Sequence, residues 1–231
     1  MNRTFIKLFV AFLAALFCVP VLFSADIAGD SGIAFGDESP SSPLSLQGSS
    51  ENKAKAMSYF AEACSRAFGR GSIDKEGVEL FFKALELDPN SSELALRILS
   101  EAGKAIPQKQ VVDRILALSL EHPEAVNLAN CAASALESSG RRPEAMKVLS
   151  AAISYAQDQD AAFNYETAQG LQLAVARLAI FQAVSQDMDG ADKTISWALE
   201  RQELKGSLQI LQAAMAVYST AKESASTSSP W

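Results

Sequence analysis

Residues 77–89 read GVELFFKALELDP and residues 111–123 read VVDRILALSLEHP; the prolines that end these segments, Pro89 and Pro123, lie 34 residues apart. A further step of 34 residues reaches residues 145–157, AMKVLSAAISYAQ, in which glutamine stands at the proline position. Each segment has small or apolar residues at its first, fifth and eighth positions, which is the spacing of one face of an α-helix. These positions are occupied by Gly77, Phe81, Ala84, Val111, Ile115, Leu118, Ala145, Leu149 and Ala152. A fixed period of this length predicts an array of repeated helical units.

Each of the three segments is preceded by another helical stretch, so the sequence predicts three helical hairpins. The expected helix pairs are Ala54–Phe68 with Lys75–Leu87, Ser92–Ala105 with Gln108–Leu120, and Glu124–Ser138 with Glu144–Ala156. Turn and cap signals separate them: Gly71, Pro107 and Gly140 in turns, Asn90 with Glu93 as a reciprocal N-cap, and Pro123 and Pro143 in first turns. No segment alternates in the way a strand does, so we expect an all-α fold.

The first helices of the three hairpins share one phase of small and apolar residues. The matching positions are Ala61, Cys64, Ser65 and Phe68, then Ala95, Ile98, Leu99 and Ala102, then Ala129, Ala132, Ala133 and Leu136. A single hairpin cannot bury such a stripe, so each is expected to depend on its neighbour.

A fourth unit follows after an insertion. Ala191, Ile195 and Ala198 repeat the second-helix pattern 46 residues after Ala145, and Val175, Leu178 and Ala179 precede them in the first-helix phase. The extra residues are expected near Asp160–Leu171, as a lengthened first helix. A last amphipathic helix, Leu208–Lys222, has Leu208, Leu211, Met215 and Tyr218 on one stripe and is expected to cover the end of the array.

The period and the small–large–small stripe resemble the tetratricopeptide repeat (TPR) family over residues 53–203, with units at about 53–90, 91–124, 125–158 and 160–203. The resemblance implies a right-handed α-solenoid of TPR-like hairpins, capped by residues 204–222. Ala61, Cys64-Ser65 and Phe68 stand where the family often has Trp, Leu-Gly and Tyr, and Val111 and Leu118 replace small residues, so a related helical-hairpin family remains an alternative.

The resemblance also implies that the first helices line a concave groove that binds a protein or peptide. The positions that would face it are Tyr59, Glu62, Arg66 and Arg70, then Glu93, Leu96, Ser100 and Lys104, then Asn127, Asn130, Ser134 and Glu137. Some family members grip a C-terminal carboxylate with Lys and Asn, but Glu62 and Arg66 stand at those positions. Asn127 and Asn130 form the more informative pair, because neighbouring amides on one helix face can bond a peptide backbone.

Residues 1–25 have the layout of a secretory signal peptide: Arg3 and Lys7, then the uncharged stretch Leu8–Phe23, then Ser24-Ala25. Retention of this stretch as an inner-membrane anchor is the alternative. Phe17 before Cys18 argues against a lipoprotein site.

Residues 26–52 are rich in Ser, Gly and Pro and are expected to be a disordered linker, and residues 223–231 a disordered tail. Cys64 lies in the first unit and Cys131 in the third, with a whole repeat between them. This separation favours packing roles for both residues over a disulfide.

The sequence contains no recognisable catalytic, cofactor or metal motif. His122 is the only histidine, no Gly-rich phosphate loop is present, and the net charge of −7 argues against binding to nucleic acid. We therefore expect no enzyme activity and no cofactor, and a protein-binding scaffold or adaptor in the bacterial periplasm or cell envelope. Two alternatives remain: the helical N-terminal region of a larger envelope enzyme or secretion component continuing past Trp231, or a membrane-anchored scaffold that forms homo-oligomers. Membrane contact is expected only if the N-terminal segment is retained.

Overall fold

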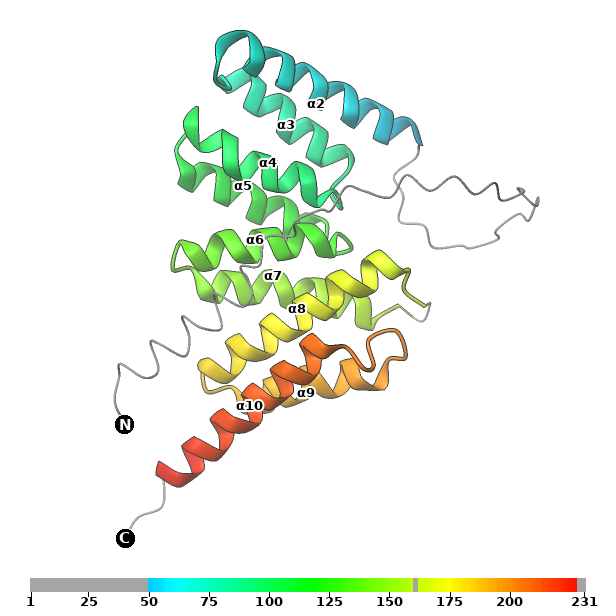
Figure 1. Ribbon diagram of the computed structural model, residues 1–231, viewed down its shortest axis with the longest axis vertical. Helices are drawn as coiled ribbons and strands as arrows, with labels where there is room; N and C mark the ends of the chain where they lie inside the picture. The colour runs from blue at the N-terminus through cyan, green and yellow to red at the C-terminus, as the bar shows by residue number, and fades with distance from the viewer. Residues whose placement is uncertain (1–49, 160–161, 228–231) are drawn as a thin grey trace, which may run out of the picture. The chain divides into compact units, whose positions relative to one another are not determined.

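A computed structural model describes residues 50–159 and 162–227 of the chain, and this part is entirely helical (Figure 1). The all-α class predicted from the sequence is confirmed for these residues. The elements are α2 (Ser50–Arg70), α3 (Lys75–Leu87), α4 (Ser92–Glu101), the short 3₁₀ helix η1 (Ala102–Lys104), α5 (Gln108–Glu121), α6 (Val126–Ser138), α7 (Arg142–Gln157), α8 (Tyr165–Val184), α9 (Met188–Glu200) and α10 (Leu208–Thr227).

The predicted helices agree with these bounds to within a few residues. The predicted second helix, Lys75–Leu87, coincides with α3, and the predicted lengthened helix of the fourth unit corresponds to α8, which has 20 residues. Gly71 and Gly140 occupy turns with φ of +72° and +74°, a left-handed conformation that side chains with a Cβ rarely adopt.

Consecutive helices pack against one another from α2 to α10, as the helix labels in Figure 1 allow the reader to follow. In addition, α4 packs against α6, α6 against α8, and α8 against α10, while α5 packs against α7. Most helices from α4 onward therefore contact the next helix and the next but one, whereas α2 makes its extensive contact with α3.

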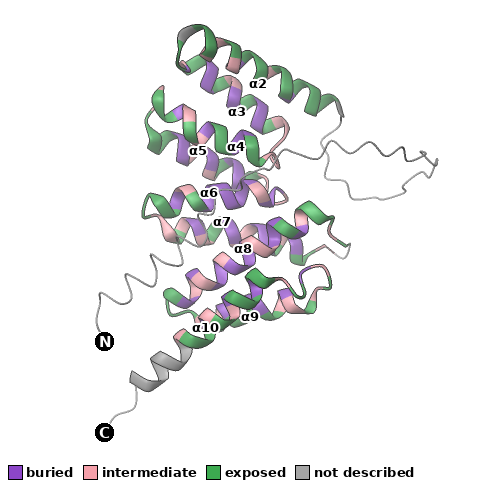
Figure 2. Ribbon diagram, in the orientation of Figure 1, coloured by how far each residue is buried: buried purple, intermediate pink, exposed green. Residues whose placement is uncertain are grey.

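The core lies between these helices and is built from the predicted second-helix stripe. Phe81, Ala84, Ile115, Leu118, Ala145, Leu149, Ala152, Ala191, Ile195 and Ala198 are all buried. Figure 2 shows the same pattern as buried bands along the facing sides of the helices, with α2 exposed along most of its length. The 34-residue pattern therefore identifies the core correctly.

The helix starts require two corrections. The N-cap of α4 is Ser91, whose Oγ accepts a hydrogen bond from the Leu94 amide at 3.4 Å, and not Asn90. The side chain of Asn90 instead accepts from the Asn127 amide at 3.4 Å, because α6 follows close to the α3–α4 turn. Pro143 lies in the first turn of α7 as predicted, but α6 begins at Val126, three residues after Pro123.

The apolar stripe predicted to attach the last helix is wrong. α10 packs against α8 and α9 through Ile210, Ala213 and Val217, which are buried. Leu208, Leu211, Met215 and Tyr218 are exposed instead, at 68%, 44%, 71% and 73%. The helix has two apolar faces, and the one that packs against α8 and α9 has the small Ala213 at its centre.

The predicted segment boundaries at the ends also change. Residues 50–52 already belong to α2, and α10 continues to Thr227, so the predicted linker 26–52 ends earlier and residues 223–227 of the predicted tail are helical. The predicted signal peptide, the rest of the linker and residues 228–231 lie outside the described residues.

Candidate functional site

A cleft of about 620 Å³ lies between α2 and α4. Its walls and floor are formed by Ala61, Cys64, Ser65, Ala67 and Phe68 of α2, Ile73 of the following turn, Phe81 of α3, and Arg97 and Glu101 of α4. This volume lies within the range of 300–1,000 Å³ that is usual for ligand pockets. The cleft therefore has room for several side chains of a bound segment.

The cleft is open because α2 turns a different face toward its neighbour than the sequence predicts. α2 contacts α3 through the buried Ala56 and Ala63, and the ring of Phe60 lies 5.5 Å from the ring of Phe81. The predicted stripe Ala61, Cys64, Ser65 and Phe68 consequently lines the cleft. This part of the first-helix prediction is wrong for α2, whereas the matching stripe is buried almost throughout α4 and α6.

Phe68 is the most exposed large apolar side chain of the cleft, with 94% of its surface accessible. The floor below it contains the buried residues Ile73 and Phe81, so the cleft joins exposed to buried apolar surface. Arg97 and Glu101 of α4 add one charge of each sign to the opposite wall. Such a surface matches a segment that presents an apolar side chain flanked by polar groups.

Two of the four predicted groove residues of α2, Arg66 and Tyr59, contact other residues of the first hairpin. Nη2 of Arg66 donates to Asp74 at 3.0 Å and also bonds Glu76. The hydrogen bond with Asp74 raises the pKa of the Arg66 guanidinium. Tyr59 is half-buried, with the ammonium of Lys83 5.9 Å from its ring centre. Glu62 is exposed, and the side chain of Arg70 lies outside what the structure describes.

The predicted groove residues of α4 and η1 are exposed. Leu96 is 57% accessible, and Glu93 and Ser100 also face solvent. Nζ of Lys104 donates to Glu101 at 2.7 Å, and this bond lowers the pKa of the glutamate. This surface continues from the cleft wall along the outer side of α4.

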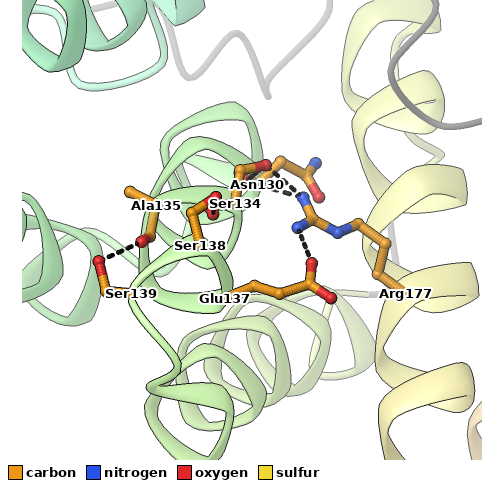
Figure 3. Close-up of polar contacts among 7 residues, drawn as sticks. All are labelled: Asn130, Ser134, Ala135, Glu137, Ser138, Ser139 and Arg177. Carbon is orange, nitrogen blue, oxygen red and sulfur yellow. Dashed lines mark hydrogen bonds and ion pairs between the residues drawn. The ribbon is translucent and has the colours of Figure 1, made fainter. Parts of the chain in front are cut away.

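The predicted groove residues of α6 bind the protein's own α8 (Figure 3). Nδ2 of Asn130 donates to the backbone carbonyl of Gly170 at 2.9 Å, and Asn130 is buried. Nη1 of Arg177 donates to the Asn130 carbonyl at 3.0 Å and to Oγ of Ser134 at 2.7 Å, and Nη2 donates to Glu137 at 3.3 Å.

Asn127 is used in the same way, since Nδ2 donates to the Asn90 carbonyl at 3.4 Å and to Glu166 at 3.3 Å. The Asn pair therefore does bond peptide carbonyls, but those of its own chain. Sequence reasoning missed Gly170 and Arg177. The sequence signal for Gly170 was a glycine inside a helical pattern. The signal for Arg177 was a single charge within the run LQLAVARLAIF (residues 171–181).

Cys131 lies beside this network, and burial raises the pKa of its thiol from 9.0 to about 11. Both Cys131 and Cys64 are free thiols. The folded protein holds the Cys131 proton at a pH where the unfolded chain has lost it, so the free energy of unfolding falls as the pH rises from about 9 to about 11.

We expect this loss to be smaller in Cys131→Ala. The pKa shift sets an upper limit of about 3 kcal/mol for the difference. Denaturant titrations of both proteins between pH 8 and pH 11, each referenced to its own value at pH 8, measure it. Parallel curves for the two proteins would contradict the assignment. Tyrosines and lysines titrate in both and cancel in the comparison.

Four further features of the described residues bear on catalysis, metal binding, membrane contact and ligand binding. His122 lies in the α5–α6 turn with Nδ1 3.0 Å from Glu124. Within residues 50–159 and 162–227, no cluster of His, Cys, Asp or Glu is arranged to hold a metal ion, and no helix has the length and apolar character needed to span a membrane. A second cavity, bounded by Pro123, Tyr155, Phe163 and Leu171, measures only about 40 Å³.

No family model, curated protein or solved structure matches the chain.

Proposed function

We propose that the chain is an exported TPR-like scaffold that binds a protein partner, and that the α2–α4 cleft is where the partner enters. The observation that carries the proposal is the exposed Phe68 beside a cleft whose floor is buried core. An isolated exposed aromatic residue is ordinary, but one that is continuous with an open apolar cleft marks an interaction site.

The proposed architecture is a right-handed α-solenoid. It is supported by the 34-residue period and by the contacts of α4 with α6, α6 with α8 and α5 with α7, in which each helix meets its counterpart in the next unit. Stacked repeats present extended surfaces suited to binding other chains.

The occupant we propose for the cleft is one amphipathic helix of the partner. In α4 and α6, the stripe that corresponds to Ala61, Cys64 and Phe68 is covered by another helix of the chain. The same stripe on α2 faces the cleft. A partner helix would place apolar residues at i, i+3 and i+4 against Phe68 and Phe81, and polar residues beside Arg97 and Glu101.

Export is the second part of the proposal and rests on residues 1–25. The mass of the mature protein, recovered from its native envelope, tests it: cleavage near Ala25 supports a periplasmic protein, and an intact N-terminus supports an anchored one.

Cys64 provides a direct probe of the cleft, because its side chain is half-buried in the cleft wall whereas Cys131 is buried and its thiol pKa is raised. We expect a maleimide at pH 7 to modify Cys64 readily and Cys131 only after denaturation, as measured by peptide mass mapping. A partner bound in the cleft is expected to protect Cys64. Equal labelling of both thiols in the native protein would contradict the described burial.

The binding test combines this probe with a matched pair of variants. Phe68→Ser removes the exposed aromatic ring of the cleft, and Tyr165→Ser removes one of similar exposure, 79%, at the start of α8. A cleft-binding partner is one that crosslinks to the native protein and to Tyr165→Ser, protects Cys64, and is lost from Phe68→Ser. Partners that bind all three proteins equally and leave Cys64 reactive would overturn the proposal.

A further inference from the structure

The exposed stripe on α10 has the spacing of a helix-pairing seam. Leu208, Leu211, Met215 and Tyr218 follow one another at intervals of three, four and three residues, which is the a/d spacing of a coiled coil. All four side chains are exposed while the opposite face of α10, with Ile210 and Val217, is buried against its own chain. The seam is thus available on a helix that is already held in place by α8 and α9.

The charge pattern of this helix indicates what covers the seam. Residues 207–221 contain no Asp, Glu, Lys or Arg, although the chain as a whole has a net charge of −7. Two copies of an acidic protein repel each other, and a contact over an uncharged segment keeps like charges out of the interface. A helix that binds an anionic membrane surface would instead present Lys and Arg, and a basic partner would be met by acidic residues.

The order of residues along the seam is self-complementary. If two α10 helices pair antiparallel through their exposed faces, with the two-fold axis crossing the seam at the level of residue 213, Leu208 lies opposite Tyr218 of the second copy, and Leu211 lies opposite Met215. Both pairs are apolar, and the flanking Gln212 and Ser219 are neutral. The central pair brings together the unbranched Met215 and Leu211, whose side chains adapt readily to each other.

We propose that the chain forms a homodimer through antiparallel pairing of the exposed faces of α10. This interface is independent of the α2–α4 cleft, and it leaves the cleft of each copy open. Because the seam consists of four side chains per copy, the dimer is expected to dissociate on dilution.

Complementary charged variants of the full chain test both the surface and the direction of pairing. Leu211→Glu alone and Met215→Lys alone each place a charge against an apolar residue twice in the dimer, so each is expected to weaken association about tenfold or more. In an antiparallel mixed dimer of the two variants, the new carboxylate faces the new ammonium, and the native Met215 of one copy faces the native Leu211 of the other. We therefore expect an equimolar mixture to recover association.

Sedimentation equilibrium over a range of concentrations measures these effects, with Met57→Lys, an exposed methionine of α2 that is 63% accessible, as the matched control. Circular dichroism verifies that each variant is folded. A native chain that stays monomeric would overturn the proposal and leave the seam to a different partner. Association that both single variants retain would assign the contact to another surface, such as Leu8–Phe23, and a mixture that stays monomeric would exclude antiparallel pairing.

Discussion

Ala84→Arg is expected to lower the free energy of unfolding by about 3–5 kcal/mol, the cost of a buried charge without a partner. Ala84 has no accessible surface and lies on the face of α3 that contributes Phe81 and Leu85 to the core. The space beside its methyl group is filled by neighbouring helices, so the arginine must either displace α3 or leave its guanidinium in an apolar environment.

Thermal and urea unfolding of Ala84→Arg and of Glu86→Arg measure this effect. Glu86 is exposed on the same helix, so the second variant introduces the same side chain without burying it. We expect a loss of stability for Ala84→Arg that is several times that for Glu86→Arg. Equal midpoints for the two variants would show that the register of α3 is wrong.

Gly170→Leu is the second change with a large expected effect, because Gly170 of α8 lies close against the start of α6. A Cβ at this position would lie 2.6 Å from Cγ1 of Val126 and 2.8 Å from Oδ1 of Asn127. The Gly170 carbonyl also accepts the hydrogen bond from Asn130. We expect a loss of about 2–4 kcal/mol, as overpacking separates the helices and leaves the buried Asn130 amide without its acceptor.

Two smaller variants separate crowding from the loss of glycine's flexibility. Gly170→Ala adds the Cβ alone and gains helix propensity of up to about 1 kcal/mol, which partly offsets the crowding. Combining Gly170→Ala with Val126→Ala gives the new methyl group space, so the two changes are expected to be less destabilising together than the sum of their separate effects. Strict additivity in urea titrations would contradict the contact.

The all-helical class and much of the core were predictable, because small and apolar residues recur at a fixed interval in the sequence. The positions of Phe81, Ile115 and Leu149 follow from the spacing alone, and all three are fully or almost fully buried. The position of α8 followed from the displaced pattern of Ala191, Ile195 and Ala198. Periodicity locates these residues because each recurs at the same place on the apolar face of a helix.

The candidate site was less predictable, because it depends on where the repetition fails. Phe68 has the same register as the buried Ala102, yet it is exposed, since α2 contacts α3 through Ala56 and Ala63. On α10, two faces are apolar, and sequence alone does not say which of them meets α8. Asn130 was predicted to bond the backbone of a bound peptide, whereas in the structure its side-chain amide donates to the Gly170 carbonyl of the same chain.

The attachment of α2 has a thermodynamic consequence for binding. Helices α4 to α8 are each held by several neighbours, whereas the extensive contact of α2 is with α3 alone. The first hairpin joins the following helices through α3, so we expect it to separate from them at a low cost in free energy. A partner that fills the cleft joins α2 to α4, so part of its binding energy is spent on holding the first hairpin against α4. The affinity of the complex and the order of the first hairpin then rise and fall together.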